Sequence, residues 1–475
     1  MSEGMSILTI VNDVKVTVPS SPRLMTNYIL QEQGDWFEDE IHFIRHFIKP
    51  GMKVIDIGAN YGLYSLSIAK IAGPSGKIWA FEPTPSTAAC LKKSIDANNF
   101  SNIELIQLGL SDRFGSASFY TSPNSELNSL SKEATAGDNV EEISLVTLDH
   151  CLAQYDWQDI DFIKLDAEGE EAKILSQGHK TLSALSPLIM FELKHLSSVN
   201  LPLIKQFKDL GYESYRLIPG LNVLVPFDPS KAADPYLLNL FCCKEDKAKE
   251  LEGKGLLVRQ WSDDFAIEDC IANSVLGELP YMKSLSGNNT LNSPSEAYSE
   301  VLKLYLMSLT EKRSSTERVA CLLTSLDKLR PLFTSGEART EHLATYARIA
   351  FDAGERSFGL DIIYSMIDRF SENMSQGISQ PFLPAAVRYD SLDPGKNLNA
   401  WLFASALEAC IEKYKFSSYY TKNDTLPLFE SLTDLGFISD GLLQRQQLNS
   451  SVGTDQTGGQ LMARWQPPVH AGSAH

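Results

Sequence analysis

The stretch Val54-Ile55-Asp56-Ile57-Gly58-Ala59-Asn60-Tyr61-Gly62 decides the fold of this chain. Its apolar start predicts a strand, its small residues predict a tight turn, and the apolar residues from Leu63 to Ala72 predict a helix. A strand, a glycine-containing turn and a helix in this order open the sheet of a nucleotide-binding α/β fold. We therefore expect a doubly wound, mostly parallel sheet with helices on both faces.

An acid near the end of this first strand distinguishes between two kinds of ligand. A dinucleotide-binding turn points backbone N–H groups at a pyrophosphate, which Asp56 would repel. S-adenosylmethionine carries an ammonium and a sulfonium instead of a phosphate, and a carboxylate favours both. The turn therefore predicts a methyl donor rather than NAD, unless it serves only for tight packing. The residues of this turn that we expect to bind the cofactor are Asp56, Gly58, Asn60 and Gly62.

The next two strands supply candidates for the adenosine end of the cofactor. Residues 77–81 form an apolar run that is closed by Glu82-Pro83. An acid that ends the second strand of such a unit accepts hydrogen bonds from both ribose hydroxyls. The third run, 103–108, leads to Asp112, which could accept from the adenine amino group or could be an ordinary turn residue. Glu82, Pro83 and Asp112 thus complete the predicted cofactor site.

Carboxylates follow the fourth central strand, 162–165, in the segment Asp166-Ala167-Glu168-Gly169-Glu170-Glu171. The ends of central strands form the ligand crevice of an open parallel sheet. We expect Asp166 beside the transferred methyl group. Glu168 is expected either to orient the acceptor or to bind a divalent ion such as Mg²⁺ together with Asp166. For Glu170 and Glu171 the simpler expectation is a solvent-facing first turn of the next helix, where acids complement the helix dipole.

The fifth strand, 187–191, ends at Glu192 and is followed by His195. Burial of Glu192 would be costly without a partner, such as Lys194 or a ligand hydroxyl. Histidine titrates in the right range to take a proton from an acceptor hydroxyl, although a histidine at a strand end can also be a structural donor. The predicted catalytic residues are therefore Asp166, Glu168, Glu192 and His195. Whether methyl transfer to oxygen uses a base or a metal stays open.

Length, charge and cysteine content restrict the class of protein. A chain of 475 residues is too long for one ordinary core, so two or three domains are expected. The formal net charge of −18 disfavours nucleic acid and anionic membranes as partners, because their phosphates would be repelled. The seven cysteines lack a C-x-x-C spacing, which is typical of reduced thiols in the cytosol. With no signal-peptide pattern and no long apolar run, we expect a soluble cytoplasmic protein.

The pattern of apolar residues changes along the chain and predicts four segments. Residues 1–245 carry the α/β pattern and begin with a β-hairpin, and residues 246–290 are predicted to be a linker. Residues 291–448 show helical spacing with short connections, which predicts an α-helical domain of helix hairpins with candidate helices between residues 295 and 435. The tail, 449–475, is predicted to be disordered. We expect the helical domain to bind a partner protein or to form a homodimer; substrate recognition and a passive role are the alternatives.

The α/β half resembles the FkbM-type methyltransferase family over about residues 25–245. The resemblance rests on Val54 to Gly62, Ala80 to Pro83, Asp161 to Glu171, and Phe191-Glu192. Asn60 replaces the middle glycine of the general G-x-G-x-G pattern, as it does in this family. The resemblance implies transfer of a methyl group from S-adenosylmethionine to a hydroxyl of a small-molecule or glycan acceptor, such as a sugar or natural product. The alternatives are an NAD-type oxidoreductase, which the acid before Gly58 disfavours, and an inactive scaffold whose helical domain binds a partner protein.

Overall fold

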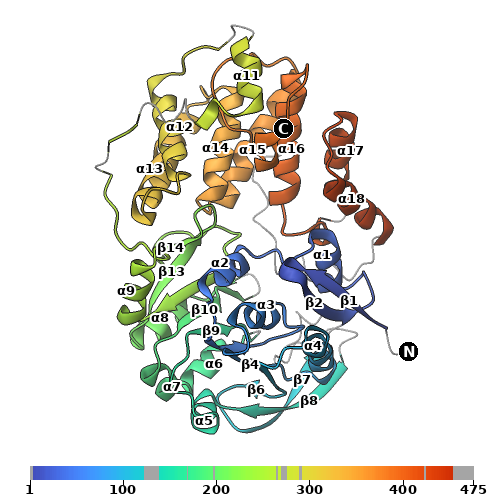
Figure 1. Cartoon of the computed structure of the whole chain (residues 1–475), viewed down its shortest axis with the longest axis vertical. Coiled ribbons are helices and arrows are strands. Elements are labelled where there is room, and N and C mark those ends of the chain that lie inside the picture. Colours follow the sequence, from blue (N-terminus) through green and yellow to red (C-terminus); the bar gives the residue numbers. More distant parts are fainter. Residues whose placement is uncertain are drawn as a thin grey trace.

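The chain folds into an α/β domain, coloured blue to green, and a helical domain, coloured yellow to red (Figure 1). The computed structural model describes residues 4–121, 139–167, 169–195, 198–263, 266–268, 275–287, 291–421 and 424–452. A mixed, mostly parallel sheet followed by a helical region confirms the predicted fold class.

The central sheet has eight strands in the order β14-β13-β15-β10-β9-β3-β4-β5. The strands from β10 to β5 run parallel to one another, whereas β15, β13 and β14 pair in antiparallel fashion at the other side. Their bounds are β3 (Lys53–Ile57), β4 (Lys77–Phe81), β5 (Ile103–Ile106), β9 (Phe162–Leu165), β10 (Leu188–Glu192), β13 (Glu213–Ile218), β14 (Val223–Pro226) and β15 (Asn239–Cys243).

Helices cover both faces of this sheet, because successive side chains of a strand point to opposite faces. Ile55 and Ile57 pack in one core with side chains of α5 to α8, whereas Val54 packs in another core with α2, α3 and α9. The helices are α1 (Met25–Gln33), α2 (Asp39–Phe47), α3 (Leu63–Ala72), α4 (Pro85–Asn98), α5 (Leu148–Gln154), α6 (Glu171–Ser176), α7 (His179–Ala184), α8 (Leu201–Asp209) and α9 (Glu245–Gly253). Helix α9 occupies the start of the segment that reads as a linker in the sequence.

Three smaller sheets complete the α/β domain. The N-terminal hairpin pairs β1 with β2 through the short helix η1, and it packs on α3 and α4. The remaining strands form one sheet of three strands and one of two. The bounds of these elements are β1 (Met5–Ile10), η1 (Val11–Asp13), β2 (Val14–Pro19), β6 (Gly109–Leu110), β7 (Gly115–Thr121), β8 (Asn139–Val146), β11 (Lys194–His195) and β12 (Ser198–Val199).

The helical domain follows the pattern of helix hairpins, since α12 packs on α13 and α14 packs on α15. Its described helices are α11 (Pro280–Gly287), α12 (Glu296–Ser308), α13 (Ser315–Thr334), α14 (Thr340–Asp352), α15 (Arg356–Glu372), η3 (Val387–Ser391), α16 (Leu398–Lys413), η4 (Ser418–Tyr420), α17 (Leu426–Asp434) and α18 (Asp440–Val452). The last helix was not expected from the sequence, and it extends into the predicted tail; residues 453–475 lie outside the described residues.

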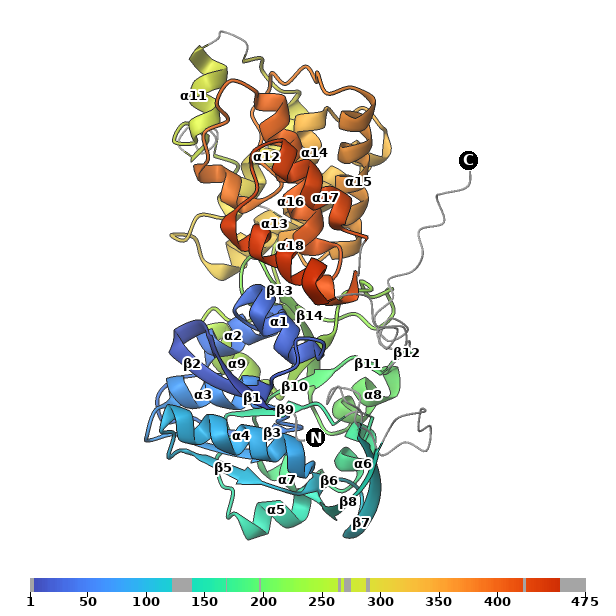
Figure 2. The same ribbon diagram turned by 90° about the vertical axis from the view of Figure 1, so that its right-hand side faces the viewer.

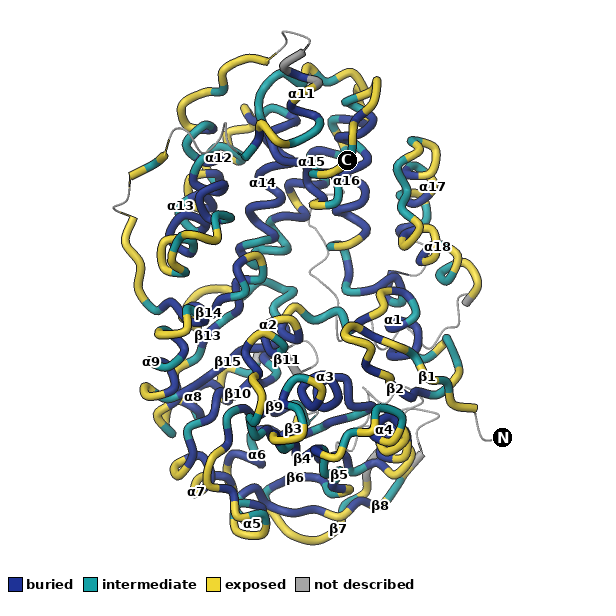
Figure 3. Tube along the Cα trace, in the orientation of Figure 1, coloured by how far each residue is buried: buried dark blue, intermediate teal, exposed yellow. Residues whose placement is uncertain are grey.

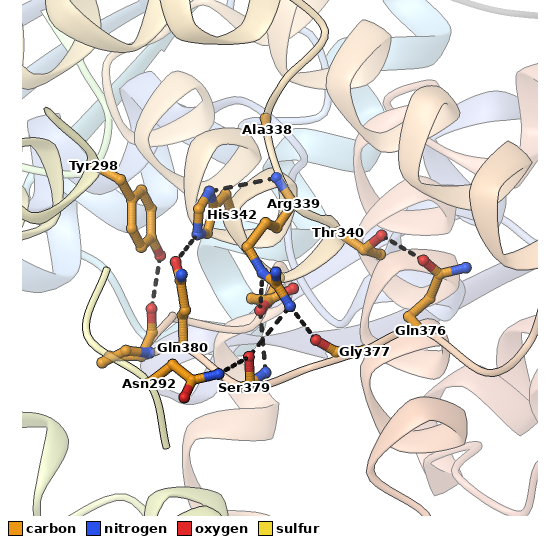
Figure 4. A network of polar contacts seen from close by, with 12 residues as sticks. Asn292, Tyr298, Ala338, Arg339, Thr340, His342, Gln376, Gly377, Ser379 and Gln380 are labelled. Atoms are coloured by element: carbon orange, nitrogen blue, oxygen red, sulfur yellow. Dashed lines mark hydrogen bonds and ion pairs between the residues drawn. The ribbon is translucent and has the colours of Figure 1, made fainter. Parts of the chain in front are cut away.

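A polar network fixes the connection between α15 and η3 to the other helices (Figure 4). The ring of His342 stacks on Tyr298 with centroids 3.6 Å apart, and its Nε2 lies 2.6 Å from Gln380 Oε1. Arg339 Nε donates to Glu341 Oε1 at 2.8 Å, and the same carboxylate oxygen accepts from the connection. Burial lowers the pKa of His342, because it disfavours the charged form of the ring. The stacked ring thus serves the packing of the domain.

The apolar cores of the two domains meet at the hairpin β13–β14. Ile218, Val223 and Val225 of the hairpin β13–β14 belong to the core of the helical domain, whereas Leu217 and Leu224 of the same hairpin face the sheet core. Buried residues accordingly run from one domain into the other (Figure 3). On the other side, α1 lies against α18 (Figure 2). None of the helices in the described ranges combines the length and the apolar character needed to cross a lipid bilayer.

Candidate functional site

A cleft opens at the carboxyl ends of β3, β4, β9 and β10, where ligands bind in open α/β sheets. It encloses about 1380 Å³ of empty space, part of it open to solvent. Its walls come from α1, the segment 36–38, the turn after β3, the ends of the strands, and the segment 108–110. The predicted residues that line this cleft are Gly58, Asn60, Glu82, Pro83, Asp166 and Glu192.

The turn after β3 needs its glycines for different reasons. Gly58 has a φ of 77°, and a Cβ at this position would lie 1.8 Å from the carbonyl oxygen of Asp166. Gly62 has a φ of 88°, and a Cβ there would lie 2.3 Å from Leu91 Cδ1. Gly62 does not line the cleft, so its role in the structure is to let α3 pack on α4. Asn60 adopts a left-handed φ of 50°, which asparagine tolerates.

Glu82 is held at the mouth of the cleft by backbone groups. Its Oε2 accepts from the N–H of Asn60 and its Oε1 from the N–H of Thr84, both at 2.9 Å. Each carboxylate oxygen keeps a second lone pair for a ligand hydroxyl. Burial raises the pKa of Glu82 to about 7, although the two backbone hydrogen bonds lower it. The two backbone hydrogen bonds thus hold the carboxylate in one orientation at the end of β4.

Apolar side chains beside Glu82 form a slot suited to a flat base. Pro83, Leu108, Leu110 and Ile143 line this part of the cleft. Asp112, which was expected to bind adenine, does not line it. Its carboxylate is 3.3 Å from Arg113 on the surface and accepts weakly from Ser111. The structure therefore does not bring Asp112 together with the other predicted residues.

Asp56 lies beneath the cleft rather than at its surface. Its carboxylate is fully buried, accepts from Ser65 Oγ at 2.6 Å and lies 3.7 Å from Lys164 Nζ. The side chain points to the face of the sheet that α3 covers, because Asp56 is still inside β3 and shares that face with Val54. Burial raises the pKa of Asp56, while Lys164 and Ser65 oppose this effect. Direct contact between Asp56 and a ligand in the cleft is therefore not what the structure shows.

Lys164 connects Asp56 to the cleft, although the sequence analysis assigned it no role. Its ammonium donates to Asp166 Oδ2 at 3.0 Å and to the carbonyl oxygen of Gly58 at 3.2 Å. Burial alone would lower the pKa of Lys164, but the charges of Asp166 and Asp56 outweigh it and raise the pKa. A lysine inside an otherwise apolar strand was the available signal for this ion pair.

Glu38 and Tyr64 form a second pair that the sequence did not reveal. The hydroxyl of Tyr64 donates to Glu38, and both side chains line the cleft. Burial raises the pKa of Glu38, with a further contribution from the charge of Asp166. Because Glu38 and Tyr64 are 26 residues apart and lie in different elements, no local pattern connects them.

Acids also meet after β9 and β10. Oxygens of Asp166, Glu171 and Glu192 lie within 4.8 Å of one another. Contrary to expectation, Glu170 and Glu171 do not face solvent, since they are 6% and 2% exposed. Glu171 Oε1 accepts from the N–H of Ala167 at 2.8 Å, so it closes the turn that follows β9.

Two predicted catalytic residues remain predictions. Glu168 lies outside the described residues. For His195 the structure gives the backbone, in the short strand β11, but not the side chain.

The fold and the cleft define an α/β domain with an acid-rich cleft at the carboxyl ends of its parallel strands. Residues 56–214 match the family model described as methyltransferase FkbM domain. This part of the chain is therefore an FkbM methyltransferase domain, and the family is one of S-adenosylmethionine-dependent methyltransferases.

One curated relative is the protein-L-isoaspartate O-methyltransferase of Methanothrix thermoacetophila, which is 25% identical over 59 residues. That match covers 12% of this chain and 28% of the relative, so the chain spans less than a third of its length.

Solved structures give weaker matches. An S-adenosylmethionine-dependent O-methyltransferase of Thermotoga maritima is 14% identical at a TM-score of 0.26, with 50% of this chain and 77% of that chain covered. An rRNA methylase of Streptococcus thermophilus is 12% identical at a TM-score of 0.26, with 43% and 93% covered. At these scores the two structures add nothing to what the family model shows.

Proposed function

We propose that this protein transfers a methyl group from S-adenosylmethionine to a hydroxyl of a sugar, a glycan or another natural product. The observation that carries the proposal is the charge of the cleft. Among the described residues that line it, Lys164 is the one cation, and the acids are Glu38, Glu82, Asp166, Glu170 and Glu192. Such a cleft favours a ligand with an ammonium and a sulfonium and opposes the pyrophosphate of NAD.

We assign the cofactor one direction in the cleft. Glu82 would accept from the ribose hydroxyls, and the slot beside Leu108 and Leu110 would hold the adenine. The cationic methionine end would then lie toward Asp166. We assign Asp56 an indirect role, because it positions Lys164 and thereby the carboxylate of Asp166.

The reaction requires an acceptor oxygen in line with the methyl group. An oxygen lone pair forms the new O–CH₃ bond while the S–CH₃ bond breaks, and its electron pair stays on sulfur as a neutral thioether. The hydroxyl proton must leave with the reaction. We assign its removal to Asp166 or Glu192, directly or through a water, with His195 as the third candidate.

The ion pair of Lys164 with Asp166 favours such a base over a metal. An ammonium 3.0 Å from Asp166 already neutralises part of the charge that Mg²⁺ would need at Asp166, Glu171 and Glu192. Activity that survives a chelator would support the base route, whereas activity restored only by Mg²⁺ would overturn it.

Calorimetric titration with S-adenosylmethionine, with NAD as the control, tests the cofactor assignment. We expect binding of the methyl donor alone. If neither ligand binds, the inactive scaffold becomes the better description. His195→Ala should then be compared with the wild-type protein in a methyl-transfer assay on sugar and glycan hydroxyls. A loss of turnover with cofactor affinity kept is the result expected of a base.

A further inference from the structure

A second cavity lies between the two domains and is adjacent to the cofactor cleft. Phe37, Glu38 and Leu238 line both spaces. The second cavity has a volume of about 500 Å³. This lies within the roughly 300–1,000 Å³ of sites that bind small ligands. The cavity therefore has room for a ligand of that size.

The two spaces share a wall at Glu38. The charges of Asp166 and Lys164 both act on Glu38, so this wall lies near the ion pair at the end of β9. A molecule seated in the second cavity would therefore approach the part of the cofactor cleft that holds Asp166.

Both domains build the walls of this cavity. Arg216 and Asp234 belong to the α/β domain, whereas Asp327 is on α13 and Arg356 begins α15. Arg216 Nη1 donates to the carbonyl oxygen of Ala353 at 2.9 Å, and this bond crosses between the domains. The helical domain is thus part of the site and not an appendage to it.

The walls combine aromatic rings with carboxylates. Tyr236 and Trp261 line the cavity, and Trp261 is 38% exposed. The carboxylates of Asp263 and Asp327 lie on the same walls. Sugar rings present apolar C–H faces to aromatic rings and hydroxyls to carboxylates, so this combination suits a carbohydrate.

Arg356 adds a donor to these walls. Its guanidinium lies 4.6 Å from the ring centroid of Tyr236 and 4.5 Å from that of Phe416, and its Nε donates to the carbonyl oxygen of Lys413 at 2.7 Å. Its Nη2 is buried and has no hydrogen-bond partner among the residues that the structure describes. The two rings and the carbonyl oxygen of Lys413 thus hold the guanidinium of Arg356 in one orientation at the wall of the cavity.

Other classes of ligand fit less well. Five basic side chains line the cavity against eight acidic ones, which disfavours a phosphorylated molecule. A peptide that adds as a strand would need a free sheet edge. The edge strand β14 is covered, because Leu224 exchanges backbone hydrogen bonds of 2.9 Å with Leu256 and Val258.

We propose that this interdomain cavity, defined by Glu38, Tyr236, Trp261, Asp327 and Arg356, binds a neutral oligosaccharide whose hydroxyl is the methyl acceptor. The role of the oligosaccharide as methyl acceptor rests on the proposed function, whereas its binding in the cavity does not. In this proposal the helical domain forms half of the acceptor site.

A glycan array probed with the full-length protein, with S-adenosylhomocysteine present, tests this proposal. We expect binding to at least one oligosaccharide, with affinity at least tenfold lower in Trp261→Ala and in Asp327→Asn. Asp368→Asn is the matched control, because Asp368 is also an exposed acid of the helical domain but lies outside the cavity. All variants should keep the wild-type affinity for S-adenosylhomocysteine, which also shows that they fold.

The outcomes separate the two proposals. Oligosaccharide binding without affinity for S-adenosylhomocysteine would remove the proposed function and keep the cavity assignment. Cofactor binding without any bound oligosaccharide, or equal oligosaccharide binding by wild type and both cavity variants, would overturn the cavity assignment.

Discussion

Glu32 on α1 and Arg445 on α18 form an ion pair that is buried between the two domains, with Arg445 Nε 2.7 Å from Glu32 Oε1. The same carboxylate accepts from the N–H of Ser418 at 2.9 Å and from the hydroxyls of Ser417 and Ser418. Helix α1 also carries Met25 and Thr26, which line the cofactor cleft. One carboxylate therefore ties the last described helix to a wall of the cleft.

Replacing the carboxylate of Glu32 should lower the stability of the protein. Glu32→Gln leaves the charge of Arg445 buried without its partner, so we expect a loss of about 3 kcal/mol in the free energy of unfolding. Urea denaturation measures it. Asp96→Asn removes one side of an exposed pair with Lys92 and should cost less than about 1 kcal/mol. Equal losses in the two variants would contradict the importance of the buried pair.

Glu82 should contribute to cofactor affinity through its two free lone pairs. Glu82→Gln replaces one acceptor oxygen by a donor, and we expect a loss of about 2 kcal/mol, or roughly 30-fold, in affinity for S-adenosylhomocysteine. Calorimetry measures this change. Glu104→Gln, at a half-buried acid of the neighbouring strand β5 that lies outside the cleft, is the control and should leave affinity unchanged. Unchanged affinity in Glu82→Gln would refute the ribose assignment.

The pKa of about 7 at Glu82 predicts a pH dependence of binding. Ribose hydroxyls donate to the ionised carboxylate, so binding should favour ionisation and release a proton below about pH 7. Affinity for adenosine should therefore fall about tenfold between about pH 8 and about pH 6. Adenosine is the probe because it lacks the titrating amino group of the full cofactor. In Glu82→Gln the pH dependence should disappear.

The raised pKa of Glu82 also affects the folding stability of the free protein. Stability should fall with rising pH, whereas affinity for adenosine should increase. Because the folded state holds the Glu82 proton more tightly than the unfolded state, this carboxyl group favours folding at low pH. Its contribution is fully present below its ordinary pKa of 4.5 and is lost as the pH rises through about 7.

Lys164 should be needed for stability because it compensates the fully buried Asp56. Lys164→Met leaves that carboxylate without its cation, and we expect a loss of about 3–5 kcal/mol in the free energy of unfolding. Adding Asp56→Asn removes the uncompensated charge and should restore part of the loss. A double-mutant cycle by urea denaturation measures the coupling. Additive losses would show that the two residues do not act as a pair.

The sequence predicted most of the fold because its signals are local. Apolar runs with the correct periodicity marked the central strands, and helical spacing marked the helices from α12 to α17. Helix α18 was missed because its segment Gln444-Arg445-Gln446-Gln447 is polar and begins beside Gly441, so no apolar stripe announces it. Its place depends on Arg445, whose partner is more than 400 residues earlier in the chain.

The site residues were predictable only where the sequence signal was local. Glu82 follows its strand directly, and a strand-end acid is a pattern that can be recognised locally. Asp56 was placed in the cleft because the residue type suited the ligand, but its position inside β3 turns the side chain toward α3. Glu38 reaches the cleft only because α2 packs on α3, which is a tertiary contact that no short motif encodes.

The hairpin β13–β14, which presents Ile218 to one core and Leu217 to the other, has a consequence for how the protein melts. Neither domain can lose its structure without exposing apolar side chains of the other, so heating should give a single calorimetric transition and not two. A chain shortened after residue 258 would leave the helical-domain face of this hairpin bare, and we expect it to aggregate instead of surviving as an independent enzyme.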